Sequence, residues 1–374
     1  GVVVVQSGAA AGGVLQGALR RHPQVLGLSA ERNMQGVVRF LRGECGMGEG
    51  EVADLVGKYP SVLGLSVPRK LSPTVSFLRD EVGVTKPKLK GLLRRSPQIL
   101  GLSLNNTLRG RVTFLRDEVG VPPHKMPGVL TQAPSLLTYS EAKCRSNIRC
   151  LRDSLNMSSS SVTKAVTKCP SLLLSDLPLR LSPLIAFLTD EAGVPPSKMA
   201  SLLTKQPTLI TSSLPSKIRP TVSWLRSTLK LAPQDLGRVV AAQPALLSFS
   251  LSENLKPKVG FLCDRLGITP SDVGRMVATF PPLLTLSTEF NVEPKLSVLL
   301  DEAFVPPSTL IRSPQLLGYS LEGRIVPRCA ALMSAGLFNG RGLAGILAPT
   351  DAVFEQRFGV IVEVDIDDED WGDE

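Results

Sequence analysis

Basic side chains recur two residues before a proline along most of this 374-residue chain, an arrangement that suits phosphate binding. This proline-proximal series comprises Arg21, Lys58, Arg95, Lys168, Lys205 and Arg312, with Arg20 and Arg94 beside it and with Gln132, Ala242 and Thr279 interrupting it. Cations at a constant interval form a row on a repetitive structure, and such a row suits a nucleic-acid backbone. A structural role competes, because Lys and Arg near a helix C-terminus each stabilise the helix dipole by ~0.3–1 kcal/mol. We expect the series as a whole to bind phosphates.

A second basic series follows a recurring Phe-Leu pair and differs in its neighbours. This Phe-Leu series comprises Arg42, Arg79, Arg116, Arg152 and Arg226. Acids follow it or occupy equivalent positions, at Asp80-Glu81, Asp117-Glu118, Asp153, Asp190-Glu191 and Asp301-Glu302. A phosphate that approached these arginines would also meet the acids. We therefore predict a charge-compensated, solvated surface here, whereas the proline-proximal series has no such acidic partner in the sequence.

No motif in the chain indicates catalysis, a cofactor or a bound metal. The segment Gly340–Gly345 matches G-x-G-x-x-G but lacks the flanking strands that a dinucleotide site requires. Ser161–Lys164 matches S-x-x-K without the companion motifs of that enzyme class. The six cysteines form no C-x-x-C pair, and His22 and His124 lie far apart in the sequence. We predict a non-enzymatic protein without cofactor or metal, whose cysteines are reduced core residues.

The prolines themselves recur at a nearly constant interval. They are Pro23, Pro60, Pro97, Pro134, Pro170, Pro207, Pro244, Pro281 and Pro314, spaced by 36 or 37 residues until a final interval of 33. A fixed period of this size characterises stacked-repeat proteins. The period predicts an all-α solenoid over residues 1–325, with a partial first repeat.

Each interval contains the same succession of signals. A leucine-rich stretch too short for a full helix follows the proline and predicts a 3₁₀ turn. Apolar residues at helical spacing then predict a first helix, which contains the Phe-Leu pair, and a second helix runs to the next proline. The first helix ends at a residue suited to a left-handed cap: Gly46, Gly83, Gly120, Asn156, Gly193 or Gly267.

This motif resembles that of the mitochondrial transcription termination factor (mTERF) family, over roughly residues 14–325. The resemblance implies a superhelical solenoid of about nine repeats of roughly 37 residues, each with two α-helices and a 3₁₀ turn. It also implies nucleic-acid binding along a basic concave path and an organellar location, the mitochondrion or alternatively the chloroplast. Members of the family act in transcription termination or initiation, RNA splicing or ribosome assembly.

The charge is unevenly distributed along the chain. The net charge is +9, but residues 361–374 contain eight acids and no Lys or Arg, which leaves +17 for residues 1–360. A strongly basic body favours a polyanionic partner. We predict a helical cap at residues 326–360 and an acidic tail at 361–374 that is disordered or bound to a protein partner. The chain has no run of eighteen apolar residues, so we expect no membrane insertion.

Two functions remain open from the sequence. The leading hypothesis is a non-catalytic organellar protein that regulates gene expression, by transcription termination or RNA metabolism, through a basic groove that contacts phosphates. Most aromatic residues lie at core positions, which favours double-stranded DNA or structured RNA, including rRNA, over a single strand. The alternative is a structural or assembly component of an organellar ribosome that binds rRNA and neighbouring proteins.

Overall fold

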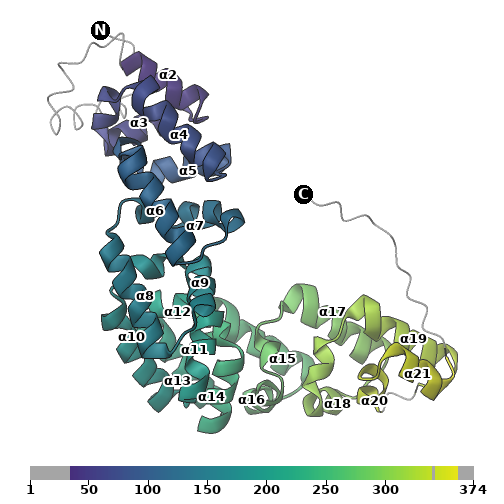
Figure 1. Cartoon of the computed structure of the whole chain (residues 1–374). Helices are drawn as coiled ribbons and strands as arrows, with labels where there is room; N and C mark the ends of the chain where they lie inside the picture. The colour runs from purple at the N-terminus through teal and green to yellow at the C-terminus, as the bar shows by residue number, and fades with distance from the viewer. Residues whose placement is uncertain (1–33, 339–341, 361–374) are drawn as a thin grey trace. The chain divides into compact units, whose positions relative to one another are not determined.

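The computed structural model describes residues 34–338 and 342–360, and all the regular elements in these ranges are helices (Figure 1). The chain divides into two compact units: unit 1 is Gly1–Ser182 with Leu203–Thr211, and unit 2 is Pro183–Leu202 with Ser212–Glu374. The predicted all-α repeat architecture is confirmed. The predicted boundaries of the solenoid and its cap stay predictions, and the acidic tail lies outside the described residues. None of the described helices is long and apolar enough to cross a bilayer.

The repeat prolines begin short turns, as predicted. Seven of them open a 3₁₀ helix, whereas Pro207 precedes the short helix α12 (Thr208–Thr211). Proline suits this first turn because its missing N–H would have no partner there. The residue before the proline leaves the helical region, as at Tyr59 (φ −140°, ψ 74°). The 3₁₀ helices are η3 (Pro60–Gly64), η6 (Pro97–Gly101), η10 (Pro134–Leu137), η11 (Pro170–Leu174), η14 (Pro244–Ser248), η16 (Pro281–Leu284) and η19 (Pro314–Gly318).

The first helix of most repeats contains π-helical turns, which the sequence did not predict. In the repeat after Pro60, π-helical turns flank a central α-helical segment, and Leu71 N–H donates to Ser66 O at 3.1 Å. Ser66 also caps this helix, since its hydroxyl accepts from the N–H of Arg69. The segments are α2 (Gln35–Gly43), η4 (Val67–Leu71), α4 (Ser72–Ser76), η5 (Phe77–Glu81), η7 (Leu104–Leu108), α6 (Arg109–Thr113), η8 (Phe114–Glu118), α8 (Glu141–Leu155), α10 (Leu177–Ala186), η12 (Phe187–Glu191), η13 (Leu214–Ile218), α13 (Arg219–Thr228), η15 (Leu251–Leu255), α15 (Lys256–Leu266), η17 (Thr288–Val292), α17 (Glu293–Leu296), η18 (Ser297–Glu302), η20 (Leu321–Ile325) and α19 (Val326–Ser334).

The residues predicted to cap the first helices adopt the left-handed conformation. Gly46, Gly83, Gly120, Gly193 and Gly267 have φ between 64° and 82°, and Asn156 has φ 50°. The two remaining equivalent positions hold Lys230 (φ 54°) and Phe304 (φ 49°), which the sequence pattern did not identify. The predicted caps are therefore confirmed, and the conformation itself recurs even where the glycine does not.

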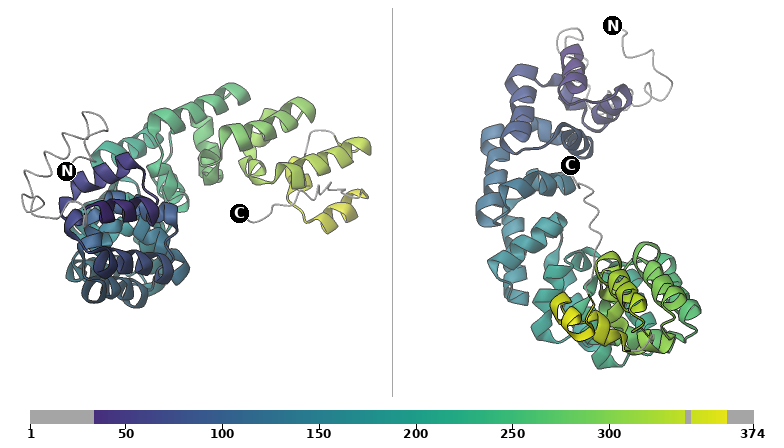
Figure 2. Two further views of the ribbon diagram at one scale, coloured as in Figure 1. Left: turned by 90° about the horizontal axis from the view of Figure 1, so that it is seen from above. Right: turned by 90° about the vertical axis from the view of Figure 1, so that its right-hand side faces the viewer.

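The second helices pack against one another in chain order within each unit. Two further views of the chain show its helices from other sides (Figure 2). In unit 1, α3 packs on α5, α5 on α7 and α7 on α9, and in unit 2 α14 packs on α16 and α16 on α18. Helix α18 has six residues where α16 has ten, which accounts for the short final proline interval. The second helices are α3 (Glu49–Lys58), α5 (Lys86–Arg95), η9 (Pro123–Lys125) with α7 (Met126–Gln132), α9 (Ser159–Lys168), α11 (Pro196–Lys205), α14 (Pro233–Ala242), α16 (Pro270–Thr279) and α18 (Pro307–Arg312); α20 (Leu343–Leu347) and α21 (Asp351–Phe358) follow α19.

The core consists of the leucines of the turns and of the Phe-Leu pairs. The second member of the pair is buried in all eight described repeats: Leu41, Leu78, Leu115, Leu151, Leu188, Leu225, Leu262 and Leu299. The first member is buried where it is Phe40, Phe77, Phe114 or Phe187, and half-buried elsewhere. The pair is thus the inward face of the first helix, as its spacing predicted.

All six cysteines are free thiols, and four of them are core residues. Cys45, Cys144, Cys169 and Cys329 are buried, while the other two are partly exposed. Burial raises the pKa of Cys45 to about 12. A thiol with that pKa stays protonated at neutral pH and is a poor nucleophile.

One position of the first helix carries buried polar side chains that tie a repeat to the next one. Its residues include Asn147, Lys258, Lys295 and Arg328, all less than 8% exposed. Three of them donate to backbone carbonyls in or just after the next repeat's turn: Asn147 to Leu173 (2.9 Å) and Ser175 (2.8 Å), Lys258 to Leu284 (2.9 Å) and Leu286, and Lys295 to Leu317 (2.9 Å). The fourth, Arg328, donates to Ile346 of α20 (2.7 Å). These buried carbonyls would otherwise lack a donor, which is costly.

The last of these donors also holds the C-terminal helices. The guanidinium of Arg328 lies 4.9 Å from the ring centroid of Phe354 and binds Asp351 at 2.5 Å. Both partners belong to α21, and Phe354 is completely buried. Helix α21 therefore docks on α19 through one buried cation.

We predict that Lys258→Met destabilises unit 2, because it removes the donor from two carbonyls near Leu284. Burial lowers the pKa of Lys258, because removing its amine from water disfavours the charged form. The hydrogen bonds to the two carbonyls offset this cost of burial. The decrease in unfolding free energy should be about 1–3 kcal/mol, measured by urea denaturation. The control is Lys256→Met, an exposed lysine of the same helix with no partner among the described residues, which should leave the midpoint unchanged. Equal midpoints for both variants would contradict this role.

Close backbone contact generates a second prediction in unit 2. A Cβ on Gly237 would lie 1.9 Å from the carbonyl oxygen of Gly193, because α14 passes directly over that cap. Gly237→Ala should therefore cost about 1–3 kcal/mol of unfolding free energy. Gly260→Ala in α15 meets nothing within 4 Å and should stabilise the helix by about 0.5–1 kcal/mol. Thermal and urea unfolding measure both, and a stabilised Gly237→Ala variant would refute the close approach.

Candidate nucleic-acid interface

The positive charge of the described chain is concentrated in unit 1. Its described residues include 23 Lys and Arg against 11 Asp and Glu, whereas those of unit 2 include 15 against 13. A surface with one dominant sign attracts a polyanion and raises its association rate. The candidate interface is therefore sought on unit 1.

Within unit 1, the second helices carry cations without acids. Helices α5 and α9, and η9 with α7, contain no Asp or Glu, whereas in unit 2 Asp235 of α14 pairs with Arg238 at 2.7 Å and Asp272 of α16 pairs with Arg275. Helix α3 is the exception in unit 1, with Glu49, Glu51 and Asp54. We call the following residues the second-helix cations: Lys58, Lys86, Lys88, Lys90, Arg94, Arg95, Lys125, Lys164, Lys168 and Lys205.

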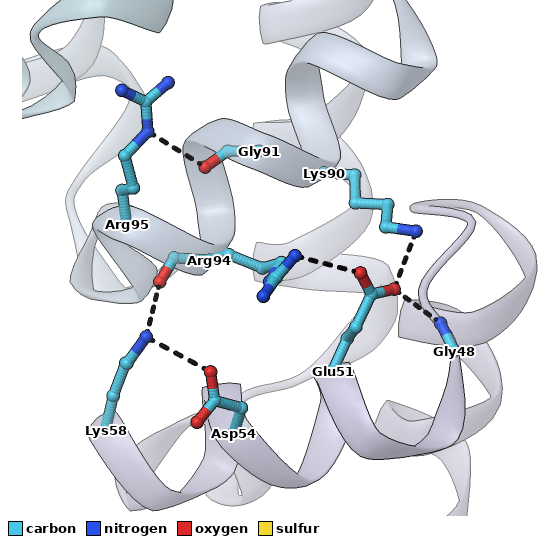
Figure 3. Close-up of polar contacts among 8 residues, drawn as sticks. All are labelled: Gly48, Glu51, Asp54, Lys58, Lys90, Gly91, Arg94 and Arg95. Carbon is cyan, nitrogen blue, oxygen red and sulfur yellow. Dashed lines mark hydrogen bonds and ion pairs between the residues drawn. The ribbon is translucent and has the colours of Figure 1, made fainter.

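The predicted site residues on these helices reach the next repeat. Lys58 Nζ lies 3.2 Å from Arg94 O (Figure 3), and Lys168 Nζ lies 3.3 Å from Lys205 O. Arg95 donates in the same way to Thr131 O. Each acceptor belongs to the C-terminal turn of the following second helix, so these cations stabilise the dipole of a neighbouring helix. A carbonyl carries no net charge, so Arg95 and Lys168 keep their charge uncompensated by these bonds.

Other predicted site residues lie apart from this group. Arg312 is in unit 2, where its Nε donates to Ser308 O of its own helix at 3.3 Å. Arg20 and Arg21 lie outside the described residues. The structure thus brings Lys58, Arg94 and Arg95 together on α3 and α5 and places Lys168 and Lys205 at the ends of α9 and α11.

The prediction that the proline-proximal series has no acidic partner is wrong for Lys58 of α3 and for Arg94 of α5. Lys58 pairs with Asp54 at 3.2 Å, and Arg94 pairs with Glu51 at 3.1 Å. Lys58 and Asp54 are one helical turn apart on α3, whereas Arg94 and Glu51 come from adjoining repeats. Within the described residues, the prediction holds for Arg95, Lys168 and Lys205, which form no ion pair.

Five of the second-helix cations were missed from the sequence: Lys86, Lys88, Lys90, Lys125 and Lys164. Lys88, Lys125 and Lys164 are exposed and have no hydrogen-bond or ion-pair partner among the described residues. None of them precedes a repeat proline by two residues, so they fall outside the proline-proximal series. The absence of Asp and Glu from whole second helices is the signal that identifies them.

Two members of the Phe-Leu series, Arg79 and Arg116, are charge-compensated as predicted, whereas Arg42, Arg152 and Arg226 form no ion pair among the described residues. Arg79 pairs with Asp80 at 2.8 Å, and Arg116 pairs with Asp117 at 2.7 Å. The hydrogen bond from each arginine lowers the pKa of its aspartate. These carboxylates therefore stay ionised and oppose a phosphate on this face.

The remaining acids of this face tie neighbouring repeats together. In three places, an arginine from one repeat lies over a core phenylalanine of the preceding repeat. The same arginine binds the glutamate that comes four residues after that phenylalanine. The pairs are Arg109 with Glu81 over Phe77 (5.1 Å), Arg145 with Glu118 over Phe114 (5.2 Å) and Arg219 with Glu191 over Phe187 (4.9 Å). Guanidinium over an aromatic face is a favourable contact. These arginines are engaged in structure, which separates them from the second-helix cations.

Large exposed apolar side chains are scarce in unit 1. Among its described residues only Leu179 is of this kind, and no aromatic side chain is exposed to that degree. Binding of single strands usually relies on exposed aromatic side chains that stack on bases. The described surface of unit 1 therefore offers charge without a stacking platform.

The architecture first defines a class: an α-helical repeat protein in which a proline begins each unit. The family model mTERF matches residues 3–190 and 180–355, so the chain belongs to the mTERF family. No curated protein matches the chain. Membership indicates an organellar protein that binds nucleic acid, in a family that is generally non-enzymatic.

Proposed function

We propose that this protein binds the sugar-phosphate backbone of double-stranded DNA or structured RNA through the second-helix cations of unit 1. By doing so it regulates organelle gene expression, in transcription termination or RNA metabolism, without catalysing a reaction. The observation that carries the proposal is the succession of second helices α5, η9 with α7, and α9, which bear exposed cations and no acid. A repeated row of cations matches a regularly charged backbone.

The chemistry of this row favours recognition of backbone and shape. Lys88, Lys125 and Lys164 are point charges that contact phosphates but distinguish bases poorly. The lack of exposed aromatic residues on the described part of unit 1 argues against base stacking. A duplex or a folded RNA, whose phosphates are held in a fixed geometry, is the partner class that fits.

We expect neutralisation of the free cations to weaken binding and to reduce its salt dependence. The variant is Lys88→Gln, Lys125→Gln, Lys164→Gln and Lys205→Gln in one chain. For every phosphate that the variant no longer binds, the slope of log K against log salt should fall by about 0.9 with duplex DNA. Fluorescence anisotropy with labelled duplex DNA and with a folded RNA, at several salt concentrations, measures it.

The matched control removes the same charge from the opposite type of helix. Arg79→Gln, Arg116→Gln, Arg149→Gln and Arg152→Gln lie on first helices of unit 1. Because Arg79 and Arg116 are already paired with acids, this variant should retain most of the affinity and slope. If both quadruple variants lose affinity equally, net charge rather than the second-helix row governs binding.

A second candidate, a structural or assembly role in an organellar ribosome, is supported by unit 2. Of the seven exposed large hydrophobic residues in the described part of the chain, six belong to it: Phe290, Phe304, Val326, Met333, Leu337 and Val353. Exposed apolar residues, where they adjoin, mark protein contacts. In this role the second-helix cations would bind rRNA while unit 2 contacts neighbouring proteins.

We propose the mitochondrion, rather than the chloroplast, as the compartment of this protein. One experiment on isolated organelles distinguishes the two roles. Nucleic acid is crosslinked to the protein in isolated organelles and sequenced, and the same extract is separated on a sucrose gradient. A regulator should yield discrete DNA or transcript sites and sediment away from ribosomal subunits. Cosedimentation with a subunit, together with rRNA crosslinks, would instead establish the ribosomal role.

A further inference from the structure

One acid lies among the cations of the candidate interface and is held by two of them. Glu51 of α3 binds Lys90 at 2.7 Å and Arg94 at 3.1 Å, both from α5 of the next repeat (Figure 3). Its carboxylate also accepts the backbone N–H of Gly48 at 2.9 Å. Two cations and an amide therefore converge on a single carboxylate.

This arrangement has the chemistry of a phosphate site. Charged donors that converge on a carboxylate also bind phosphate oxygens with similar geometry. Lys90 and Arg94 are 35% and 46% exposed at their side chains, so their charged ends are accessible from solvent. The hydrogen bond from Lys90, and then that from Gly48, lower the pKa of Glu51, so the carboxylate is ionised at neutral pH.

The position of the cluster connects it with the rest of the row. Lys58 and Arg95 lie on the same two helices as Glu51 and Arg94, and Lys58 pairs with Asp54 instead of Glu51 (Figure 3). A backbone that follows the second-helix cations from α9 towards α3 therefore meets Lys90 and Arg94. At that point Glu51 competes with it.

We propose that Glu51 occupies, in the free protein, a phosphate position formed by Lys90 and Arg94, and that a backbone phosphate of the bound nucleic acid displaces it. Glu51 is then an internal competitor that weakens binding at this end of the row. This inference rests on the proposed function, since it concerns the same interface. The competing explanation is that Glu51 only caps α3 and ties it to α5.

The substitution Glu51→Gln separates these explanations. Glutamine keeps an amide oxygen for the Gly48 N–H, so the helix start is preserved, but it removes the negative charge from Lys90 and Arg94. Glu49→Gln is the matched control: it removes the same charge from the same helix, and Glu49 has no partner among the described residues. Thermal unfolding of the full chain verifies that both variants are folded.

Displacement predicts a specific gain for one variant. Glu51→Gln should bind a labelled duplex several-fold more tightly than Glu49→Gln at low salt, with a salt slope steeper by about 0.9 for each cation released. Glu49→Gln should change affinity only slightly, through its long-range charge, and leave the slope unchanged. Equal affinities and slopes for the two variants would overturn the inference.

A second probe makes the result independent of nucleic-acid binding. Inorganic pyrophosphate, titrated into each full-length variant, should shift the side-chain NMR signals of Lys90 and Arg94 saturably in Glu51→Gln and much less in Glu49→Gln. If pyrophosphate binds in this way while no variant binds duplex, the proposed function fails and the anion site stands. If duplex binds but pyrophosphate does not distinguish the variants and the slopes agree, Glu51 is only a structural tie.

Discussion

The backbone carbonyls at the ends of several proline turns are a constraint on which the packing of neighbouring repeats depends. A 3₁₀ turn is short and cannot satisfy all the carbonyls at its end, and burial against the next repeat removes water from them. The first helix of the preceding repeat supplies the donor, as Asn147 and Lys258 do. Within each unit, a repeat cannot separate from its neighbour without leaving polar groups unpaired. This requirement explains why lysine and arginine side chains occupy core positions.

Hydrogen bonds from cations to carbonyls of the next repeat also occur at the surface, and they reconcile the structural and functional interpretations of the proline-proximal series. Arg95 and Lys168 donate to carbonyls of the next second helix, which stabilises that helix, and neither forms an ion pair among the described residues. A carbonyl accepts a hydrogen bond but does not cancel the charge, so a cation held in this way still attracts phosphate. An arginine paired with a carboxylate, such as Arg116 with Asp117, attracts phosphate much less, because the carboxylate neutralises its charge. A hydrogen bond to an uncharged carbonyl therefore fixes the position of a cation while leaving its charge available to a phosphate.

The sequence predicted what a single residue dictates and missed what a contact dictates. A proline that opens a turn and a glycine in the left-handed region each act through their own backbone, so Pro97 and Gly120 were identified correctly. The pairing of Glu51 with Arg94 joins residues 43 positions apart, and no local pattern contains it. The π-helical turns of the first helices likewise carry no known sequence signal. Lys88 was missed for another reason, because charge was compared at one repeat position rather than over a whole helix.

The distribution of charge gives the two units different chemistry. Among the described residues, unit 1 has about twice as many basic as acidic residues, whereas unit 2 is close to balance and holds most of the exposed large hydrophobic residues. Long-range attraction falls off within about 10 Å at moderate salt, so a cation acts on partners near its own helix. The balanced charges of unit 2 therefore contribute little to polyanion binding, and its acids, paired at α14, reduce that contribution further. An affinity for nucleic acid that depends on second helices should reside in the part of the chain where those helices carry no acid.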